Sequence, residues 1–179
     1  MNMKSYYTKS LGILNLIPGF IITALLLTSC GYRFAGQGNL PKDIKSIHIE
    51  IFKNNTAEIA AEHIFTNDLI SEFNKHGIQI TSKEKADAVL TCVINSMRID
   101  TVSRRDSITS LERRITGVVS ANLKDSSGNT IWMDSNIDEN ETYNVMTEKT
   151  GTDYGKKNAV RSVAKKIAEE IYNRLTQEF

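Results

Sequence analysis

The side chains best suited to nucleophilic or metal chemistry in this sequence are two cysteines, Cys30 and Cys92, and three histidines, His48, His63 and His76. No two histidines have a close metal-ligand spacing, and there is no phosphate-binding glycine loop, nucleophile elbow or zinc-protease motif. Cys92 lies in an apolar run, so we expect a buried, unpaired thiol and no disulfide. The sequence predicts a protein that is not an enzyme and holds no metal or cofactor.

Cys30 stands in a different context. The residues Leu27-Thr28-Ser29-Cys30 close an apolar stretch, 11–27, that follows Lys4 and Lys9. Basic residues, an apolar region and small residues before a cysteine are typical of a bacterial lipoprotein export signal. The four residues resemble the lipobox, where signal peptidase II cuts before a cysteine that carries a diacylglyceryl thioether. We therefore expect residues 1–29 to be removed and Cys30 to be acylated.

The alternatives for this segment are an ordinary signal peptide that has a cysteine nearby by chance, and an uncleaved membrane-spanning helix. Such a helix needs about 20 apolar residues, whereas this stretch is shorter and is interrupted by Asn15, Pro18 and Gly19. Long acyl chains, at about 0.8 kcal/mol per buried methylene, would anchor the mature chain firmly. Gly31 follows the cysteine where an Asp retention signal could stand. By resemblance to enterobacterial lipoproteins, this favours the outer membrane.

Composition and length limit what the rest can be. The chain has 22 basic and 21 acidic residues, so its near-neutral charge gives no case for nucleic-acid binding. Residues 30–42 are rich in glycine and predict a tether. Residues 43–179 have the size of one domain with a hydrophobic core.

Hydrophobic periodicity predicts the elements of this domain. An alternating run at 47–51 indicates a strand, and Asn55 with Glu58 indicates the N-cap of a helix that ends at Gly77. Residues 78–80 predict a short strand, and 86–102, 113–123 and 130–143 predict longer ones, with a tight turn at 125–129. An apolar stripe over 160–175 predicts the last helix. The expected fold is α+β, with two amphipathic helices packed on one face of a four-stranded, largely antiparallel sheet.

Several short motifs are similar to those of one known family. The chain resembles the LptE family of lipopolysaccharide-assembly lipoproteins at Cys30-Gly31-Tyr32-Arg33-Phe34, Gly36, Leu40-Pro41, 44–49, Phe52-Lys53-Asn54-Asn55-Thr56, Ala86-Asp87 and Arg161. The resemblance implies two helices on a four-stranded sheet. It also implies a periplasm-facing lipoprotein of the cell outer membrane that plugs and helps assemble the LptD β-barrel and assists lipopolysaccharide delivery.

Local charge indicates where lipopolysaccharide could bind. Basic residues outnumber acidic ones in two regions, 98–114 and 148–166. Lipid A phosphates are anionic and bind well to Arg and Lys. The candidate lipopolysaccharide-binding residues are Arg104, Arg105, Lys149, Lys156 and Lys157. Charge runs are also common on solvated surfaces, so each residue alone could be a surface residue without a ligand.

A second function keeps the anchor but changes the partner. The strand, the Phe-x-Asn-x-Thr motif and the amphipathic helix also resemble periplasmic adaptor lipoproteins that activate peptidoglycan synthases. Those adaptors carry a long linker after the acylated cysteine, whereas 31–42 spans at most about 3.5 Å per residue. The short tether favours a partner in the outer membrane.

Overall fold

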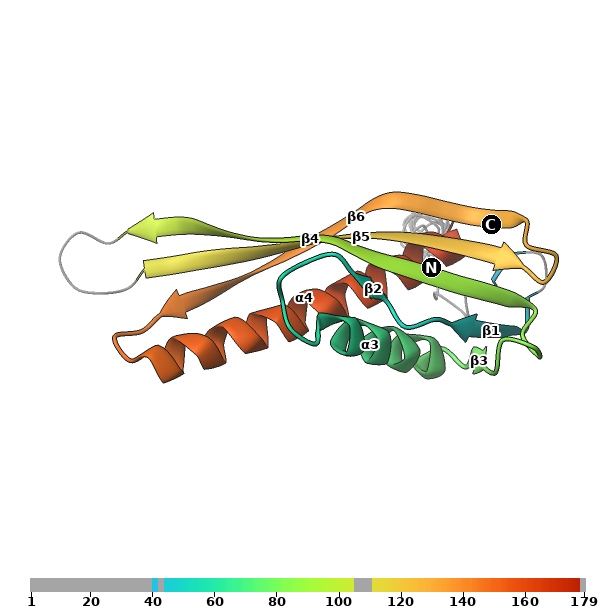
Figure 1. Cartoon of the computed structure of the whole chain (residues 1–179), viewed down its shortest axis with the longest axis horizontal. Coiled ribbons are helices and arrows are strands. Elements are labelled where there is room, and N and C mark those ends of the chain that lie inside the picture. The colour runs from blue at the N-terminus through green and yellow to red at the C-terminus, as the bar shows by residue number, and fades with distance from the viewer. Residues whose placement is uncertain (1–39, 42–43, 105–110, 178–179) are drawn as a thin grey trace, which may run out of the picture. The chain divides into compact units, whose positions relative to one another are not determined.

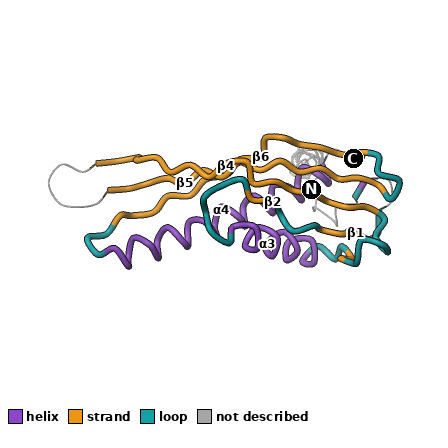
Figure 2. The backbone as a smooth tube through the Cα atoms, in the orientation of Figure 1, coloured by secondary structure: helices purple, strands orange, loops and turns teal. Residues whose placement is uncertain are grey.

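A computed structural model describes residues 40–41, 44–104 and 111–177, with side chains omitted at 103–104. The elements follow the chain as β1 (Ser46–Ile49), β2 (Lys53–Asn54), α3 (Ala61–Lys75), β3 (Gln79–Ile80), β4 (Ala88–Arg104), β5 (Leu111–Asp125), β6 (Thr130–Val145) and α4 (Lys149–Gln177). They form an α+β fold in which both helices lie on the same side of one sheet (Figures 1 and 2).

Within the described residues the sheet has six strands rather than the four expected. Its order is β3-β1-β4-β5-β6, and β2 also pairs with β4. β4, β5 and β6 form the expected antiparallel meander, but β1 is parallel to both β3 and β4, and β2 is parallel to β4. The sheet is therefore mixed. The short strand predicted at 78–80 is present as β3, but β2 was missed because its two residues are too few to show alternation. The parallel pairing of β1 was missed as well, because a local pattern does not show which strands become neighbours.

The core lies between the sheet and the helices. From α3, Phe65, Leu69 and Phe73 are almost fully buried, which confirms the predicted stripe. α4 buries Val163, Ile167 and Ile171 in the same way, and the strands contribute alternate residues from their helix-facing side.

α4 crosses the middle of the sheet at Gly117. A Cβ atom on this residue would lie 2.9 Å from Val163 Cγ1 and 3.4 Å from Ile167 Cδ1. Real Cβ atoms do not approach that closely, so the helix can lie this near to β5 only because the residue is glycine.

Both helices begin at different residues from those expected. α3 starts at Ala61, after Ala60 in a left-handed conformation, so the predicted N-cap at Asn55 is wrong. Asn54 organises the preceding loop instead: its Nδ2 donates to Glu58 O, and its Oδ1 accepts from Thr56 N. α4 starts at Lys149, well before the apolar stripe, and is 29 residues long.

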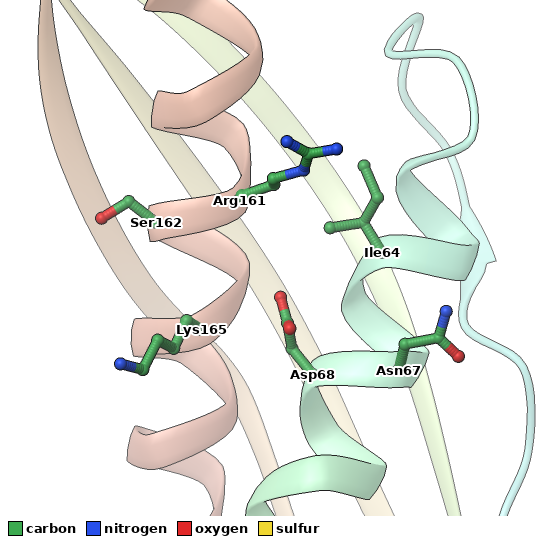
Figure 3. Close-up of a pocket in the computed structure, with 6 residues that line it drawn as sticks. All are labelled: Ile64, Asn67, Asp68, Arg161, Ser162 and Lys165. Carbon is green, nitrogen blue, oxygen red and sulfur yellow. The ribbon is translucent and has the colours of Figure 1, made fainter.

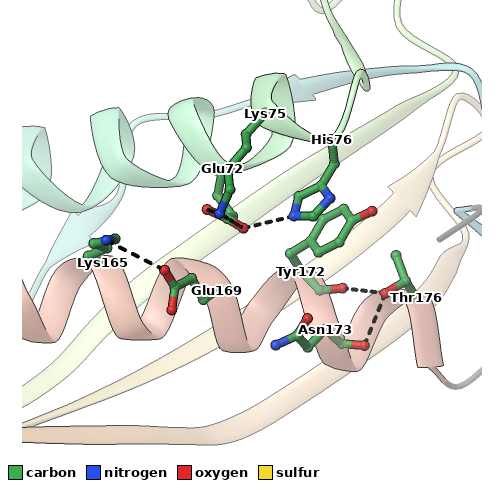
Figure 4. Close-up of polar contacts among 8 residues, drawn as sticks. All are labelled: Glu72, Lys75, His76, Lys165, Glu169, Tyr172, Asn173 and Thr176. Atoms are coloured by element: carbon green, nitrogen blue, oxygen red, sulfur yellow. Dashed lines mark hydrogen bonds and ion pairs between the residues drawn. The ribbon is translucent and has the colours of Figure 1, made fainter. Parts of the chain in front are cut away.

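The C-terminal end of α3 packs against α4 (Figure 4). The His76 ring stacks on Tyr172 with centroids 3.8 Å apart, and its Nε2 lies 2.9 Å from Glu72 Oε1. Phe73 meets the same tyrosine edge-on. Gly77 follows with a positive φ, which confirms it as the residue that ends the helix.

Candidate functional site

The candidate site is one end of the domain, here called the distal end: 95–104 of β4, 111–117 of β5, 139–145 of β6 and 149–161 of α4. Leu111 pairs with Arg104 on one side and with Val145 on the other, so the three strand ends meet. α4 begins shortly after Val145 (Figure 1). The two basic regions predicted from the sequence therefore reach the same end of the fold.

The connection from β6 to α4 is held by hydrogen bonds. Met146 N donates to Thr152 Oγ1 at 2.9 Å, and Thr152 Oγ1 donates to Met146 O at 3.1 Å. Gly151 packs against Met146, because a Cβ there would lie 2.8 Å from the methionine sulfur. These contacts fix the first turn of α4, and Lys149 with it, relative to the end of β6.

The three candidate lysines of α4 differ in their surroundings. Lys149 and Lys157 are exposed, and neither forms an ion pair with another described residue. Lys156 instead forms an ion pair with Glu58 at 2.5 Å, and both side chains are largely covered. Lys156 therefore joins the loop before α3 to α4, a role that no local sequence pattern could predict across 98 positions.

The remaining candidates are placed only in part. The backbone of Arg104 pairs with Leu111 at the end of β4. Arg105 and Cys30 lie outside the described residues.

β5 adds two arginines to the distal end. Arg114 is exposed and lies across from Asp100 on β4 and Thr142 on β6. Arg113 lies across from Tyr143, on the helix-facing side, and is half-buried. On β4, Arg98 Nε donates to Asp100 Oδ2 at 3.0 Å, so part of this positive charge is already paired.

Acidic residues of β6 hold α4 against the sheet. Glu141 accepts hydrogen bonds from Ser162 Oγ and pairs with Lys166 Nζ at 2.9 Å, contacts that hold its pKa below the ordinary value. The pKa of Asp134 is also lowered, first by the backbone N–H of Asn136 and then by Arg174, whose Nη1 lies 2.6 Å away. Lys166 is therefore a structural residue.

The alanine–aspartate pair of the family motif has a structural role as well. Asp87 Oδ2 accepts hydrogen bonds from Lys45 N, Ser46 N and Ser46 Oγ at 2.9–3.1 Å. These donors lower the pKa of the Asp87 carboxyl and tie the start of β1 to the start of β4.

A groove of about 450 Å³ runs between α3 and α4 (Figure 3). Burial raises the pKa of Asp68 on its α3 side, while the positive charges of Lys165 and Arg161 on α4 act against that shift. Arg161 is exposed, and Lys165 approaches Glu169 only to 3.9 Å. The groove is lined by Ile64, Asn67, Asp68, Arg161, Ser162 and Lys165.

Nothing in the described part of the chain resembles a metal centre, since no group of three or more His, Cys, Asp or Glu residues could hold an ion there. Cys92 is buried and free of disulfides, as expected, and burial raises the pKa of its thiol. A thiol in that state is a poor nucleophile. None of the helices in the described ranges has the length and apolar character that crossing a membrane requires.

Comparison with known proteins gives a family and a fold. Residues 44–175 match the family described as LptE, Lipopolysaccharide-assembly. No curated protein matches the chain.

Three solved structures share the fold at low sequence identity. A putative neuraminyllactose-binding hemagglutinin homolog from Helicobacter pylori has a TM-score of 0.53 at 17% identity, covering 82% of this chain and 90% of that one. The uncharacterised lipoprotein B from Nitrosomonas europaea has a TM-score of 0.51 at 15% identity, with the same coverage. The rare lipoprotein B from Shewanella oneidensis has a TM-score of 0.51 at 12% identity, covering 71% and 94%.

Proposed function

Since the chain belongs to the LptE family of lipopolysaccharide-assembly proteins, we propose that it plugs and helps assemble the LptD β-barrel and assists lipopolysaccharide delivery to the outer leaflet. In this proposal the protein is a lipoprotein of the cell outer membrane, faces the periplasm and is anchored by acyl chains on Cys30. We also propose that it is not an enzyme, because the family to which it belongs is one of lipopolysaccharide-assembly proteins.

The proposed lipopolysaccharide contact rests on one observation: some basic side chains at the distal end have no acidic partner among the described residues. Lys149 and Lys157 project from α4 without acidic partners among the described residues, and Arg114 is exposed on β5. Ammonium and guanidinium groups bind phosphate by charge-assisted hydrogen bonds. Lys156 contributes less in this proposal, because Glu58 already neutralises it.

The contact with the barrel is assigned to the sheet face opposite the helices. No helix among the described residues covers this face, whose central part is half-buried and mixes small polar with β-branched residues: Thr91, Val93, Thr116, Val118 and Ser120. A sheet face of this mixed composition suits packing against the inner wall of a barrel, where both polar and apolar contacts occur.

The test measures binding of purified lipopolysaccharide to the intact chain in detergent across a salt series. Lys149→Ala with Lys157→Ala should weaken binding about tenfold at low salt and reduce the salt dependence, because two charge-assisted contacts are lost. The matched control is Lys85→Ala with Lys124→Ala, which removes the same charge from exposed positions outside the distal end. Equal affinity and salt dependence in both double variants would remove the distal end from the binding site.

The barrel contact is tested separately by isolating the acylated chain from outer membranes with its partners. Recovery of a β-barrel protein supports the plug. Recovery of a peptidoglycan synthase instead would support the adaptor function and contradict the proposal.

A further inference from the structure

The outer edge of β4 is only partly paired. β1 pairs with its first residues, Ala88 to Leu90, and β2 with Val93 and Ile94. The last hydrogen bond along this edge runs from Asn55 N to Ile94 O. β4 continues to Arg104, yet no other strand of the described ranges lies beside it past Ile94. A stretch of strand edge therefore remains available for pairing.

The direction of the free backbone groups follows from the register. Ile94 O points outward, toward β2. One extra residue then enters β4 between Ile94 and Ser96, and a second between Thr101 and Ser103. In a strand, successive residues direct their backbone N–H and C=O groups to opposite edges. The first bulge shifts this alternation by one residue, so that the groups of Met97, Ile99 and Thr101 point away from β5. The segment between the bulges is a strand whose outward donors and acceptors have no backbone partner among the described residues.

The β6 edge of the sheet is protected against pairing with another strand by side chains of α4, whereas the free part of β4, as far as the structure describes the chain, is not. On β6, Lys166 Nζ donates to Asn140 O, and Arg174 Nη1 reaches Asn136 O. The free part of β4 has no such cover from described residues and no proline, and Ile99 is 39% exposed beside the buried Ile115. An edge with these properties is a template for strand addition.

The charge pattern of this edge is complementary to itself. Arg98 and Asp100 are the two neighbours of Ile99 in β4. Their side chains lie on the face of the sheet opposite the helices, and both are more than half exposed. If a second β4 pairs antiparallel about a two-fold axis at Ile99, then Arg98 of each copy faces Asp100 of the other. Ile99 then faces its own counterpart, and Met97 faces Thr101. Opposite charges directly across antiparallel strands are stabilising, and like charges are destabilising.

We propose that this edge of β4 is a self-association site, through which two copies of the chain pair antiparallel about Ile99 and join their sheets. The inference does not depend on the proposed barrel or lipopolysaccharide contacts. A pairing of so few residues buries less surface than a stable dimer requires, so we expect a weak, concentration-dependent dimer with a Kd of roughly 1–100 µM.

Charge reversal gives a selective test in the full chain, extracted in mild detergent and followed by analytical ultracentrifugation. Arg98→Asp and Asp100→Arg should each weaken self-association about tenfold or more, because like charges then face each other. A mixture of these two single variants should form heterodimers, since opposite charges face each other again. The double variant, Arg98→Asp with Asp100→Arg, should dimerise like the wild type. Damage to the fold would not produce this rescue.

A cysteine at the two-fold axis provides the second readout. Facing residues in such a pair have Cα atoms about 5.5 Å apart, within the range of a disulfide. Ile99→Cys should therefore form a disulfide-linked dimer under mild oxidation, whereas Met133→Cys, exposed on β6, should not. A wild type that stays monomeric at about 100 µM, a dimer unaffected by both reversals, or an Ile99→Cys chain that crosslinks only to another protein would each overturn the proposal.

Discussion

Two acidic residues on β6, Asp134 and Glu141, determine how α4 is fixed along the sheet. Each meets a cation from α4, Arg174 and Lys166 respectively, and each has a lowered pKa in the folded chain. The side chains are still partly exposed, so solvent screens each pair and its contribution to stability is modest. They act together with the close packing at Gly117 to fix the position of α4 on the sheet.

These lowered pKa values predict a pH dependence of stability. A carboxyl whose folded pKa lies below its unfolded value stabilises the fold at pH values above the unfolded pKa. That contribution is lost as the pH falls through the folded pKa. We expect the free energy of unfolding to decrease below about pH 5. Urea titrations between pH 7 and pH 3 should show a smaller decrease for Asp134→Asn, and an unchanged slope would contradict the assignment.

Gly117 gives a second prediction at the residue scale. Gly117→Ala should destabilise the fold by about 1–3 kcal/mol, because its Cβ would overlap Val163. Gly155→Ala is the control: a Cβ there would have only ordinary contacts of 3.7 Å, and alanine favours a helix interior by about 1 kcal/mol. Thermal unfolding of both variants checks this. Equal melting temperatures would mean that α4 does not pack closely on β5.

For single residues, the sequence predicted burial, helix ends and local charge better than it predicted which residues contact one another. The burial of Cys92, the helix end at Gly77 and the basic character of α4 were predictable from local patterns. The pairing of Lys156 with Glu58 was not, because it depends on how α3 and α4 pack in three dimensions. The same packing creates the groove beside Arg161. The spacing of residues in the sequence could not predict this groove, because its two sides come from different helices.

At the scale of elements, Thr66 joins α3 to the segment between β1 and β2. Its hydroxyl accepts a hydrogen bond from Phe52 N at 3.0 Å and donates to Glu62 O at 2.6 Å. Thr66 and Phe52 are both buried, so no water can replace the bond easily. This contact fixes the second turn of α3 against the segment between β1 and β2.

Thr66→Val tests that contact without changing the shape of the side chain. It should cost about 1–3 kcal/mol, because the Phe52 N–H remains buried without an acceptor. Thr176→Val is a suitable control, because its hydroxyl bonds only to carbonyls of its own helix near the end of α4. Chemical denaturation of both variants measures the free energy of unfolding. An equal decrease in the two variants would show that the hydrogen bond from Phe52 N to Thr66 contributes no more to stability than a bond within the helix.

The sequence predicted which helices and long strands exist better than it predicted the residues at which they begin and end. The stripes of α3 and α4 and the alternation of β4, β5 and β6 come from burial, which the sequence records directly. The first turns of α4 are polar, since they lie along the distal end where little packs on them, and so they carried no helical stripe. β2 and β3 exist only because β4 and β1 offer them an edge.

At the scale of the whole molecule, the proposed anchor determines where the domain can act. We predict that Cys30→Ala leaves an uncleaved precursor, because signal peptidase II requires the thioether-modified cysteine. Incorporation of labelled palmitate, compared with Cys92→Ala as a control, measures this. Label that persists in the Cys30 variant would show that the anchor lies elsewhere.

The parallel position of β1 has a consequence for synthesis. The β4–β5–β6 meander joins neighbours in the chain, so its closure costs little entropy and it can form rapidly. β1 and α3 are made first, yet their partners β4 and α4 come later, and α4 is the last element of all. Until α4 is available, the apolar stripe of α3 therefore lacks its helical partner, and exposed apolar surface of this kind favours aggregation in incompletely folded chains.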